Sequence, residues 1–369
     1  MSHKQAGGPL QGVKVIEFAG LGPAPFAGML LADLGADVLL IDRPVHSAQT
    51  VPPRKNLNHR GKRSVVLNLK DVHDLARCQA LCARADILLE GFRPGVMERL
   101  GLGPDVLLAR HPALVYGRMT GWGQSGPMAQ RAGHDINYIA LSGALHAFGH
   151  DGAAPRPPLN LVGDFGGGAL YLAFGVLAAL LHARASGQGQ VVDAAMIDGS
   201  ASLLTMMQGM VAAGMWDGAP GTNLLDGGRP WYDVYATADG QWLSVGALEP
   251  QFYAELLRGT CLDATETLAM RADPKHWPTL RSRLASAIRA RTRDEWTAIF
   301  AESDACVAPV LSYEEAARDA HLQARETYGI VDGVLQAMPA PRFSVTPGAI
   351  RHPPPVPGEH GESAMKDWC

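Results

Sequence analysis

The chain has few cysteines, and none of them forms a recognisable motif. The five are an odd and scattered set in which the nearest pair lacks CxxC spacing: Cys78, Cys82, Cys261, Cys306 and Cys369. Neither a disulfide framework nor a cysteine-ligated metal site is therefore expected. We interpret the thiols as reduced side chains that mostly serve packing.

The sequence also lacks the long apolar runs that carry a chain into or across a membrane. Its first residues, MSHKQAGGPLQG, contain no signal-peptide core. The longest apolar stretch, ALYLAFGVLAALLHA at 169–183, is shorter than the run of about 18 residues that a spanning helix needs. The final residues, KDWC, are not an SKL-type peroxisomal signal. We therefore expect a cytoplasmic protein with no membrane partner.

No charge of one sign dominates the sequence. The formal net charge is −4, charged residues make up 18% and hydrophobic residues 47% of the chain. This composition is typical of a folded protein and gives no reason to expect nucleic acid as a partner. With 369 residues, the chain is long enough for two domains.

Short β-branched segments alternate with helical patterns in the N-terminal half. Strands are predicted at 13–18, 36–42, 64–69, 85–92, 113–119 and 190–196. Helices are predicted between these strands and at 134–147, 165–185 and 197–214. Strands that alternate with helices predict an α/β fold with a parallel, helix-covered sheet.

The pattern changes near residue 220. The segment 232–248 predicts a β-hairpin that turns at ADG, and helices are predicted at 250–259, 276–290 and 293–303. The segment 304–316 predicts a strand that leads into a helix, and the proline-rich last thirty residues are expected to be irregular. These features predict a smaller α+β module after the α/β domain.

Several motifs for cofactors, metals or nucleophiles are incomplete. GLGPAP (20–25) follows a strand as a dinucleotide loop does, but Pro23 and Pro25 remove N–H donors and the third glycine is missing. His146 and His150 have helical spacing without an HExxH motif or a third ligand, so no metal is expected. GQSG (123–126) does not have the GxSxG spacing of a nucleophile elbow.

Basic residues lie near several predicted strand ends. They are Arg43, Lys62, Arg63, Arg93 and Arg99. Strand ends of a parallel sheet share one crevice, so these side chains are candidates for a phosphate site. The alternative is that each is a solvated surface charge, which is the usual role of a single arginine.

Two titratable residues have both a structural and a catalytic interpretation, and a third has a structural one. His134 in GHDINY starts a predicted helix and is either structural or a proton carrier, with Asp135 beside it as a cap or an orienting group. Asp164 in LNLVGDFGGG has the position of an N-cap, beside N–H groups that would be free to stabilise an enolate oxygen. Glu249, before Pro250, has the position of a helix cap.

Five segments occur in one order along the chain: GHDINYIALSG, LNLVGDFGGG, GTNLLDGG, VGALEPQFY and DACVAPVL. With them, and with LQGVKVIEFAGLGPAPFAGMLLADLGADVLLIDRP near the N-terminus, the chain resembles the family III CoA-transferase superfamily. Within that superfamily it resembles the branch that racemises 2-methylacyl-CoA thioesters. The resemblance covers nearly the whole chain.

The resemblance implies a large Rossmann-like, CoA-binding α/β domain made from both chain ends, residues 1–194 and 339–369. It implies linkers at 195–225 and 322–338 and a small α+β domain at 226–321. It further implies an interlocked homodimer, in which each active site lies between the large domain of one chain and the small domain of the other.

The resemblance also implies the chemistry. His134 and Asp164 would be the acid and base that interconvert (R)- and (S)-2-methylacyl-CoA, and Glu249 from the partner chain would orient His134. The implied CoA-binding residues are Arg43, Leu67, Asn68, Leu69, Lys70, Arg93, Arg99, Gly133, His134, Asp135, Ile136, Asn137 and Tyr138. No cofactor is needed, because coenzyme A is part of the substrate.

Two alternatives stay open. One is a CoA transferase of the same family, in which Asp164 attacks the thioester. The other is a catalytically silent acyl-CoA-binding protein. One departure from the family is the absence of the targeting tripeptide that its peroxisomal members carry.

Overall fold

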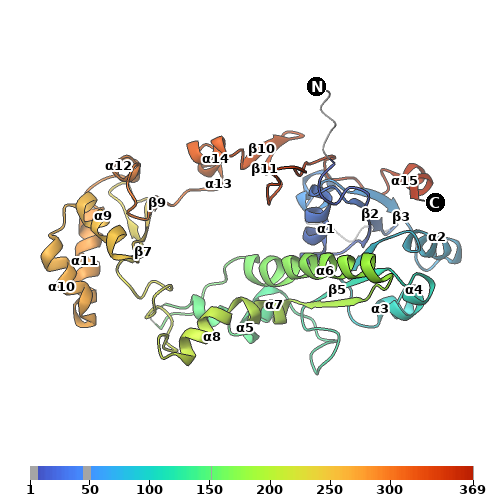
Figure 1. Ribbon diagram of the computed structural model, residues 1–369, viewed down its shortest axis with the longest axis horizontal. Helices are drawn as coiled ribbons and strands as arrows, with labels where there is room; N and C mark the ends of the chain where they lie inside the picture. The colour runs from blue at the N-terminus through green and yellow to red at the C-terminus, as the bar shows by residue number, and fades with distance from the viewer. Residues whose placement is uncertain (1–6, 45–50, 151, 369) are drawn as a thin grey trace. The chain divides into compact units, whose positions relative to one another are not determined.

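The protein is described by a computed structural model that covers residues 7–44, 51–150 and 152–368, so Cys369 lies outside the described residues. The chain divides into two compact units. Unit 1 comprises Met1–Ala144, Pro158–Leu204 and Ala320–Cys369, and unit 2 comprises Leu145–Pro157 and Thr205–Asp319. Unit 1 thus combines segments from both ends of the colour scale (Figure 1).

A six-stranded sheet forms the centre of unit 1, with strand order β3-β2-β1-β4-β5-β6 and parallel pairing throughout. The strands are β1 (Lys14–Phe18), β2 (Asp37–Asp42), β3 (Arg63–Val66), β4 (Ile87–Glu90), β5 (Val115–Thr120) and β6 (Val191–Ala195). The predicted parallel α/β sheet is confirmed. The chain order reverses between β1 and β4, and such a switch point opens a crevice at the carboxyl ends of the strands.

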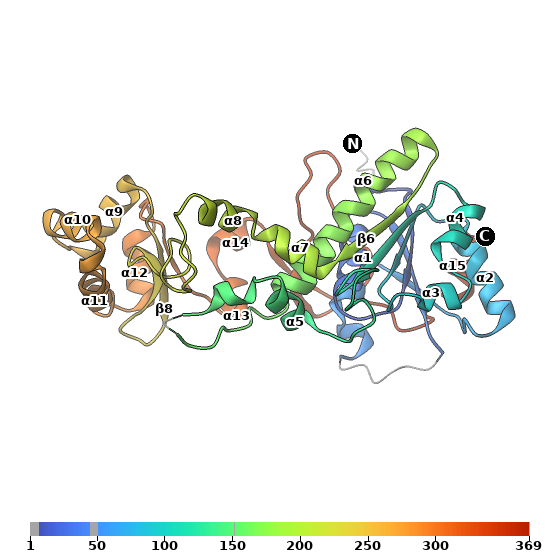
Figure 2. The ribbon, with the colours of Figure 1, turned by 90° about the horizontal axis from the view of Figure 1, so that it is seen from below.

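Helices cover both faces of this sheet. The unit contains α1 (Pro23–Asp33), α2 (Val72–Cys82), α3 (Val96–Arg99), α4 (Pro104–Arg110), α5 (Asp135–Leu141), α6 (Leu170–Ser186), α7 (Met196–Leu203), α14 (Ala320–Ala324) and α15 (Gly361–Trp368). Neighbouring residues of β1 face opposite sides, since Val15 belongs to one buried cluster and Ile16 to the other. Figure 2 shows α6 on one side of the sheet and α2, α4 and α15 on the other.

The longest helical stretch runs from Leu161 to Ser186. By length and composition alone it is long and apolar enough to cross a membrane. Its first part, Leu161–Ala169, is π-helical and is called the π segment below. Its second part, α6, buries Leu172 and Val176 in the core beside the sheet.

The last part of the chain differs from the sequence-based expectation. The expectation that the last thirty residues are irregular is wrong, because Gly361–Trp368 forms α15. Ala364 and Trp368, four residues apart on one helix face, are buried in the core of unit 1. The predicted linker 322–338 contains an antiparallel hairpin, β10 (Tyr328–Val331) and β11 (Val334–Ala337).

Unit 2 is built on a three-stranded antiparallel sheet in the order β7-β8-β9. Its strands are β7 (Tyr232–Ala236), β8 (Trp242–Gly246) and β9 (Val307–Pro309), so the predicted hairpin is confirmed. Its helices are α8 (Thr205–Ala212), α9 (Pro250–Thr260), α10 (Ala264–Ala272), α11 (Trp277–Ile288), α12 (Arg293–Phe300) and α13 (Tyr313–Ala316). Leu243, Leu256, Leu280 and Trp296 are among its buried core residues.

Two predicted helices are shorter than expected. The helix predicted at 134–147 ends at Leu141 and is followed by a separate 3-10 turn, Leu145–Phe148. The helix predicted at 197–214 is interrupted at Leu204, which ends α7 before α8 begins. Both interruptions coincide with boundaries between the two units. The remaining 3-10 turns are Pro53–Lys55, Leu57–His59 and Pro274–His276.

Candidate active site

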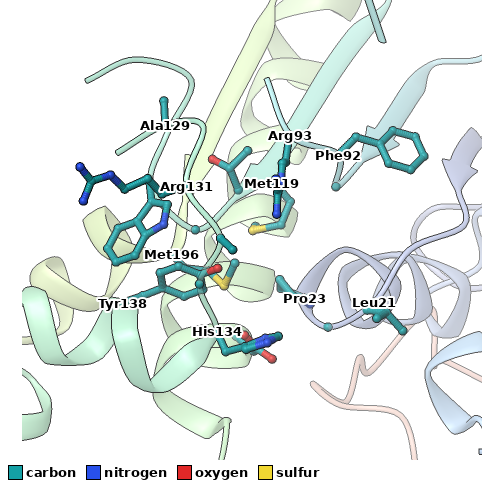
Figure 3. Close-up of a pocket in the computed structure, with 18 of the residues that line it drawn as sticks. Leu21, Pro23, Phe92, Arg93, Met119, Ala129, Arg131, His134, Tyr138 and Met196 are labelled. Atoms are coloured by element: carbon teal, nitrogen blue, oxygen red, sulfur yellow. The ribbon is translucent and has the colours of Figure 1, made fainter. Parts of the chain in front are cut away.

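A cavity of about 520 Å³ lies in unit 1 where several parallel strands end. Residues that follow β1, β4 and β5 line it, as expected for a crevice at the carboxyl edge of a parallel sheet. Figure 3 shows Pro23, Arg93, Met119, His134, Tyr138 and Met196 around this cavity, which Asp164 also lines. The structure therefore brings the two predicted proton carriers, His134 and Asp164, to one place.

A second cavity, of about 640 Å³, lies beside the ends of β1, β2 and β3. Five of the predicted CoA-binding residues line it: Arg43, Leu67, Asn68, Leu69 and Lys70. Phe92 lines both cavities, and the guanidinium carbon of Arg43 lies 5.8 Å from the centre of its ring. The two cavities are thus neighbours that share one aromatic wall.

His134 is placed by the start of α5. Its backbone is extended at the N-cap position, and its N–H donates to Oδ1 of Asn137 over 3.0 Å. Helix α5 packs against the π segment, which carries Asp164. This packing explains how residues thirty positions apart in the sequence line one cavity.

Asp164 lies inside the π segment, so the N-cap interpretation of this residue is wrong. The helical turn begins at Leu161, and the N–H of Phe165 donates to the carbonyl of Asn160, five residues earlier, over 3.3 Å. The N–H of Asp164 donates to Oδ2 of Asp135 over 2.7 Å. Neither N–H is free for an enolate oxygen, which corrects the expectation drawn from the sequence.

The surroundings of Asp164 favour its protonated form. Burial raises the pKa of its carboxyl group, and this effect exceeds the lowering by the hydrogen bond that Nδ2 of Asn160 donates to Oδ2 over 3.1 Å. The charge of Asp135 raises the pKa further, and the charge of His134 lowers it. A carboxyl group that holds its proton above the ordinary pKa range of aspartic acid is suited to proton transfer.

The GLGPAP turn has a role that the sequence did not reveal. Gly22 has a φ of +70°, and a Cβ atom added there would lie 3.3 Å from Oδ2 of Asp164. A side chain at this position would be strained and would crowd the carboxyl group. The turn therefore lets the main chain pass close to Asp164 at the cavity wall.

The remaining predicted CoA-binding residues fall into two groups. Arg93, Gly133 and Tyr138 line the first cavity, where the Tyr138 ring packs edge-on against Trp122 with centroids 4.7 Å apart. The others line neither cavity: Arg99, Asp135, Ile136 and Asn137. Their binding roles stay predictions.

Glu249 belongs to unit 2. It occupies the N-cap position of α9, between β8 and the helix. Arg271 donates to the carbonyl of the preceding Leu248 over 2.5 Å, and its guanidinium carbon lies 4.2 Å from the centre of the Tyr253 ring. The predicted role of Glu249 in orienting His134 stays a prediction.

Two basic residues considered for a phosphate site have structural partners instead. Lys62 is fully buried and paired with Glu17, and Arg63 pairs with Asp37 and Asp367. These three ion pairs occupy both side chains, and neither residue lines one of the two cavities. Residue type and strand position could not show this, because the carboxylates come from other parts of the chain.

The sequence analysis missed several residues at the first cavity. Arg131 brings a second guanidinium group to it, and Met119, Trp122 and Met196 provide apolar walls. Met119, Trp122 and Met196 lie at or next to the ends of β5 and β6. The predicted strand ends were the only signal that could have indicated these three residues.

Comparison with known proteins identifies the family. The profile of CoA-transferase family III matches residues 10–361. Alpha-methylacyl-CoA racemase of Mus musculus is 44% identical over 363 residues, which is 97% of this chain and 93% of that protein. The racemase of Homo sapiens is 42% identical over 364 residues, again 97% and 93% of the two chains.

Solved structures agree with this assignment at the level of the fold. The crystal structure of a CAIB/BAIF family protein from Brucella suis superposes with a TM-score of 0.85 at 24% identity, covering 98% of this chain and 100% of that one. Nearly the full length of the chain thus shares both the fold and the family profile. The chain belongs to CoA-transferase family III.

Proposed function

We propose that the protein is a racemase that interconverts (R)- and (S)-2-methylacyl-CoA thioesters by removing and returning the proton on carbon 2. The observation that carries this proposal is that His134 and Asp164 line the same cavity. An imidazole and a partly buried carboxyl group are both suited to general acid–base catalysis. The similarity to two proteins named as alpha-methylacyl-CoA racemases supports the same choice.

The two cavities suit the two parts of an acyl-CoA. Arg43 and Lys70 bring positive charge to the second cavity, which fits the phosphates of coenzyme A. Because Phe92 lines both cavities, the pantetheine arm would extend past this residue toward His134 and Asp164. The thioester and its branched acyl carbon would then lie in the first cavity.

Inversion requires two proton carriers on opposite sides of one carbon. A thioester makes the neighbouring C–H weakly acidic, because the charge moves onto the carbonyl oxygen of an enolate. Neutral His134 removes the proton from one face, and protonated Asp164 returns a proton to the other face. In the reverse direction the aspartate removes the proton and the histidinium returns it. Each positioned group contributes about 10²- to 10⁴-fold in rate.

The raised pKa of Asp164 supports this assignment. A carboxyl group that must donate a proton has to retain it at the working pH, and burial of Asp164 favours that state. The chain's own side chains move both protons, and coenzyme A enters as part of the substrate.

The proposal includes a homodimer with shared active sites in the cytoplasm. Helix α6 has an apolar stripe that faces solvent, formed by Leu170, Phe174 and Leu181 with exposed fractions of 52%, 75% and 72%. A stripe of this kind is typical of a protein interface. Light scattering of wild type and of Phe174→Glu tests the dimer, with a dimeric mass expected for the first and a smaller mass for the second.

Co-expression tests whether Glu249 acts across the dimer. If it orients His134 of the partner chain, His134→Ala and Glu249→Ala subunits are each inactive alone, but a mixed dimer contains one intact site. Recovery of exchange activity in co-expressed, doubly tagged dimers is the expected result. Absence of recovery would place Glu249 elsewhere.

Deuterium exchange tests the reaction itself. In D₂O the enzyme should incorporate deuterium at carbon 2 of a 2-methylacyl-CoA, and His134→Ala and Asp164→Ala should each nearly abolish the incorporation. Calorimetric titration with CoA should show that both variants still bind. If wild type binds acyl-CoA without exchange, the racemase proposal fails.

A CoA transferase is the second candidate, favoured by the family to which the chain belongs. There Asp164 would attack the thioester carbonyl, release CoA as the thiolate and form a mixed anhydride. Hydroxylamine trapping on Asp164, combined with absence of deuterium exchange, would select this function. Binding with neither reaction would select a silent acyl-CoA-binding protein.

A further inference from the structure

Asp135 is a buried acidic residue that lines neither cavity. Only 7% of its surface is exposed, and its Oδ2 atom accepts the hydrogen bond from the N–H of Asp164. Its Oδ1 atom is buried and has no hydrogen-bond partner among the described residues. Burying a carboxylate with an oxygen left unpaired destabilises the fold, so the position calls for a functional explanation.

The π segment makes the hydrogen bond to Asp135 available. In a regular α-helix each N–H bonds the carbonyl four residues earlier. Here the turn is one residue wider, as the bond from Phe165 to Asn160 shows, and the N–H of Asp164 points to Asp135 instead. Such widened turns occur often at functional sites.

Gly163 leaves the space that Asp135 needs. A Cβ atom added to Gly163 would overlap Oδ2 of Asp135 and would lie 3.1 Å from Cγ2 of Ile139. On the other side, Gly22 approaches the Asp164 carboxyl group at a distance only a glycine allows without strain. Two glycines and one buried carboxylate therefore define where Asp164 lies.

We propose that Asp135 is a positioning residue for proton transfer: its buried carboxylate fixes the main chain of Asp164, so that the Asp164 side chain enters the cavity facing the substrate's reacting carbon. This inference rests on the proposed function, because it concerns the proton carried by Asp164. A role that acts through Asp164 also explains how Asp135 can affect the reaction although it lines neither cavity.

The charge of Asp135 has a second consequence. Burial is the largest cause of the raised pKa of Asp164, and the hydrogen bond from Asn160 opposes it. The charge of Asp135 raises this pKa further, while the charge of His134 lowers it. The other ionisable groups at the cavity are Arg93, Arg131 and Tyr138. Removing the charge of Asp135 should therefore let Asp164 lose its proton at lower pH.

Charged groups on the other elements that pack against the π segment have their own partners or face solvent. Arg118 of β5 binds Glu90 and Glu98, and Asp33 of α1 binds Arg60. Tyr171 of α6 donates to Ser202, and Asp193 of β6 accepts from the N–H of Gln124. Asp198 of α7 is exposed and serves as a charge-matched control.

Two variants separate the hydrogen bond from the charge. Asp135→Asn keeps an oxygen that accepts the N–H of Asp164 but removes the charge, and Asp135→Ala removes both. Amide hydrogen exchange of the peptide covering residues 160–169 should become faster in Asp135→Ala and stay slow in Asp135→Asn and in the control Asp198→Asn. This readout does not depend on activity.

Kinetics then test the effect on proton transfer. Asp135→Ala should lower kcat for α-deuterium exchange by about 10²-fold, the effect of a small misplacement of a reacting group, with KM little changed. Asp135→Asn should recover part of kcat. With the enantiomer from which Asp164 removes the proton, the acid limb of its pH profile should move to lower pH, because that direction requires the Asp164 carboxylate. Asp198→Asn should leave that limb in place.

Three outcomes would overturn the proposal. They are unchanged amide exchange with wild-type kcat in Asp135→Ala, an unmoved acid limb in Asp135→Asn, and an effect confined to KM, which would assign Asp135 to ligand binding. If Asp135→Ala does not fold, the pH profile of Asp135→Asn decides. If wild type shows no deuterium exchange, the proposed function fails, while the amide-exchange comparison still decides whether Asp135 fixes Asp164.

Discussion

Nζ of Lys62 lies 2.7 Å from the carboxylate of Glu17, and both side chains are completely buried under α1. Nζ also donates to the carbonyl of Pro25 over 2.8 Å, in the first turn of that helix. The same turn begins with Pro23 at the wall of the first cavity. A buried ion pair thus holds the part of the chain that borders Asp164.

Removing one partner of this ion pair should lower the free energy of unfolding far more than removing both partners. Lys62→Met leaves the Glu17 carboxylate buried without its cation, which should lower the free energy of unfolding by about 3–5 kcal/mol. The double variant Glu17→Leu, Lys62→Met should be close to wild type, because burial of both charges is avoided. Urea unfolding followed by tryptophan fluorescence measures the difference.

An additive effect would contradict this interpretation of the pair. Arg77→Met serves as the control, since Arg77 pairs with Asp74 in a partly exposed contact within α2. Exposed pairs contribute about 0–1 kcal/mol, so this variant should unfold at nearly the same urea concentration as wild type.

The stability of Asp164→Asn relative to wild type should depend on pH. The folded state raises the pKa of Asp164 above its ordinary value of 3.8, because burial disfavours the charged form. Such a group stabilises the fold below its unfolded pKa, and this contribution is lost as pH rises through the folded pKa. Asp164→Asn should therefore melt higher than wild type at about pH 7, with a smaller difference at about pH 4.

Thermal melting at both pH values gives the answer. Asp198→Asn, which removes an exposed carboxylate, should show no such change between the two conditions. A constant difference for Asp164→Asn across this pH range would mean that burial does not penalise the charge of Asp164.

A methyl group at Gly163 should reproduce the loss of Asp135. The added carbon would overlap Oδ2 of Asp135 and displace the carboxylate from the N–H of Asp164. We expect about a 10²-fold loss of kcat with CoA binding retained. Gly209→Ala in α8 is the matched control, since an added Cβ meets nothing within 4 Å there. Wild-type turnover of Gly163→Ala would show that the space is not critical.

Coenzyme A affinity should distinguish the predicted arginines. Arg43 lines the second cavity, whereas Arg99 lines neither cavity. Losing one charge-assisted hydrogen bond to phosphate costs about 1.5–3 kcal/mol, so Arg43→Ala should weaken CoA binding by about tenfold or more. Arg99→Ala should weaken CoA binding less than Arg43→Ala does. Calorimetry at two salt concentrations should also show weaker salt dependence for Arg43→Ala. Equal losses would extend the binding site to Arg99.

The parallel sheet could be predicted because its signal is local. Runs such as VKVIEF and DVLLID are β-branched, and helical patterns separate them. The amphipathic helix α15 was missed because the preceding proline-rich residues dominated the expectation, although Ala364 and Trp368 have helical spacing. Local sequence patterns thus indicated the strands of the sheet, whereas the proline-rich composition of the C-terminal residues concealed helix α15.

Partners distant in sequence account for most of what could not be predicted. Lys62 and Arg63 were candidates for phosphate binding, but Glu17 and Asp37 are their partners. Aspartate is a common N-cap residue, yet Asp164 lies inside a π-helical turn. Its N–H donates a hydrogen bond to Asp135. Which carboxylate meets which N–H depends on packing of α5 against the π segment, and no spacing in the sequence encodes that contact.

The completion of unit 1 by α15 has a consequence for synthesis on the ribosome. Trp368 is buried in the core beside the sheet, and its Nε1 atom donates to Asp37 over 2.9 Å. Strand β2 is therefore translated more than three hundred residues before the helix that covers it. All of unit 2 leaves the ribosome in the interval, so it can fold while the larger unit still lacks its last helix. Until α15 has been made, the apolar side chains that pack against Ala364 and Trp368 lack this cover.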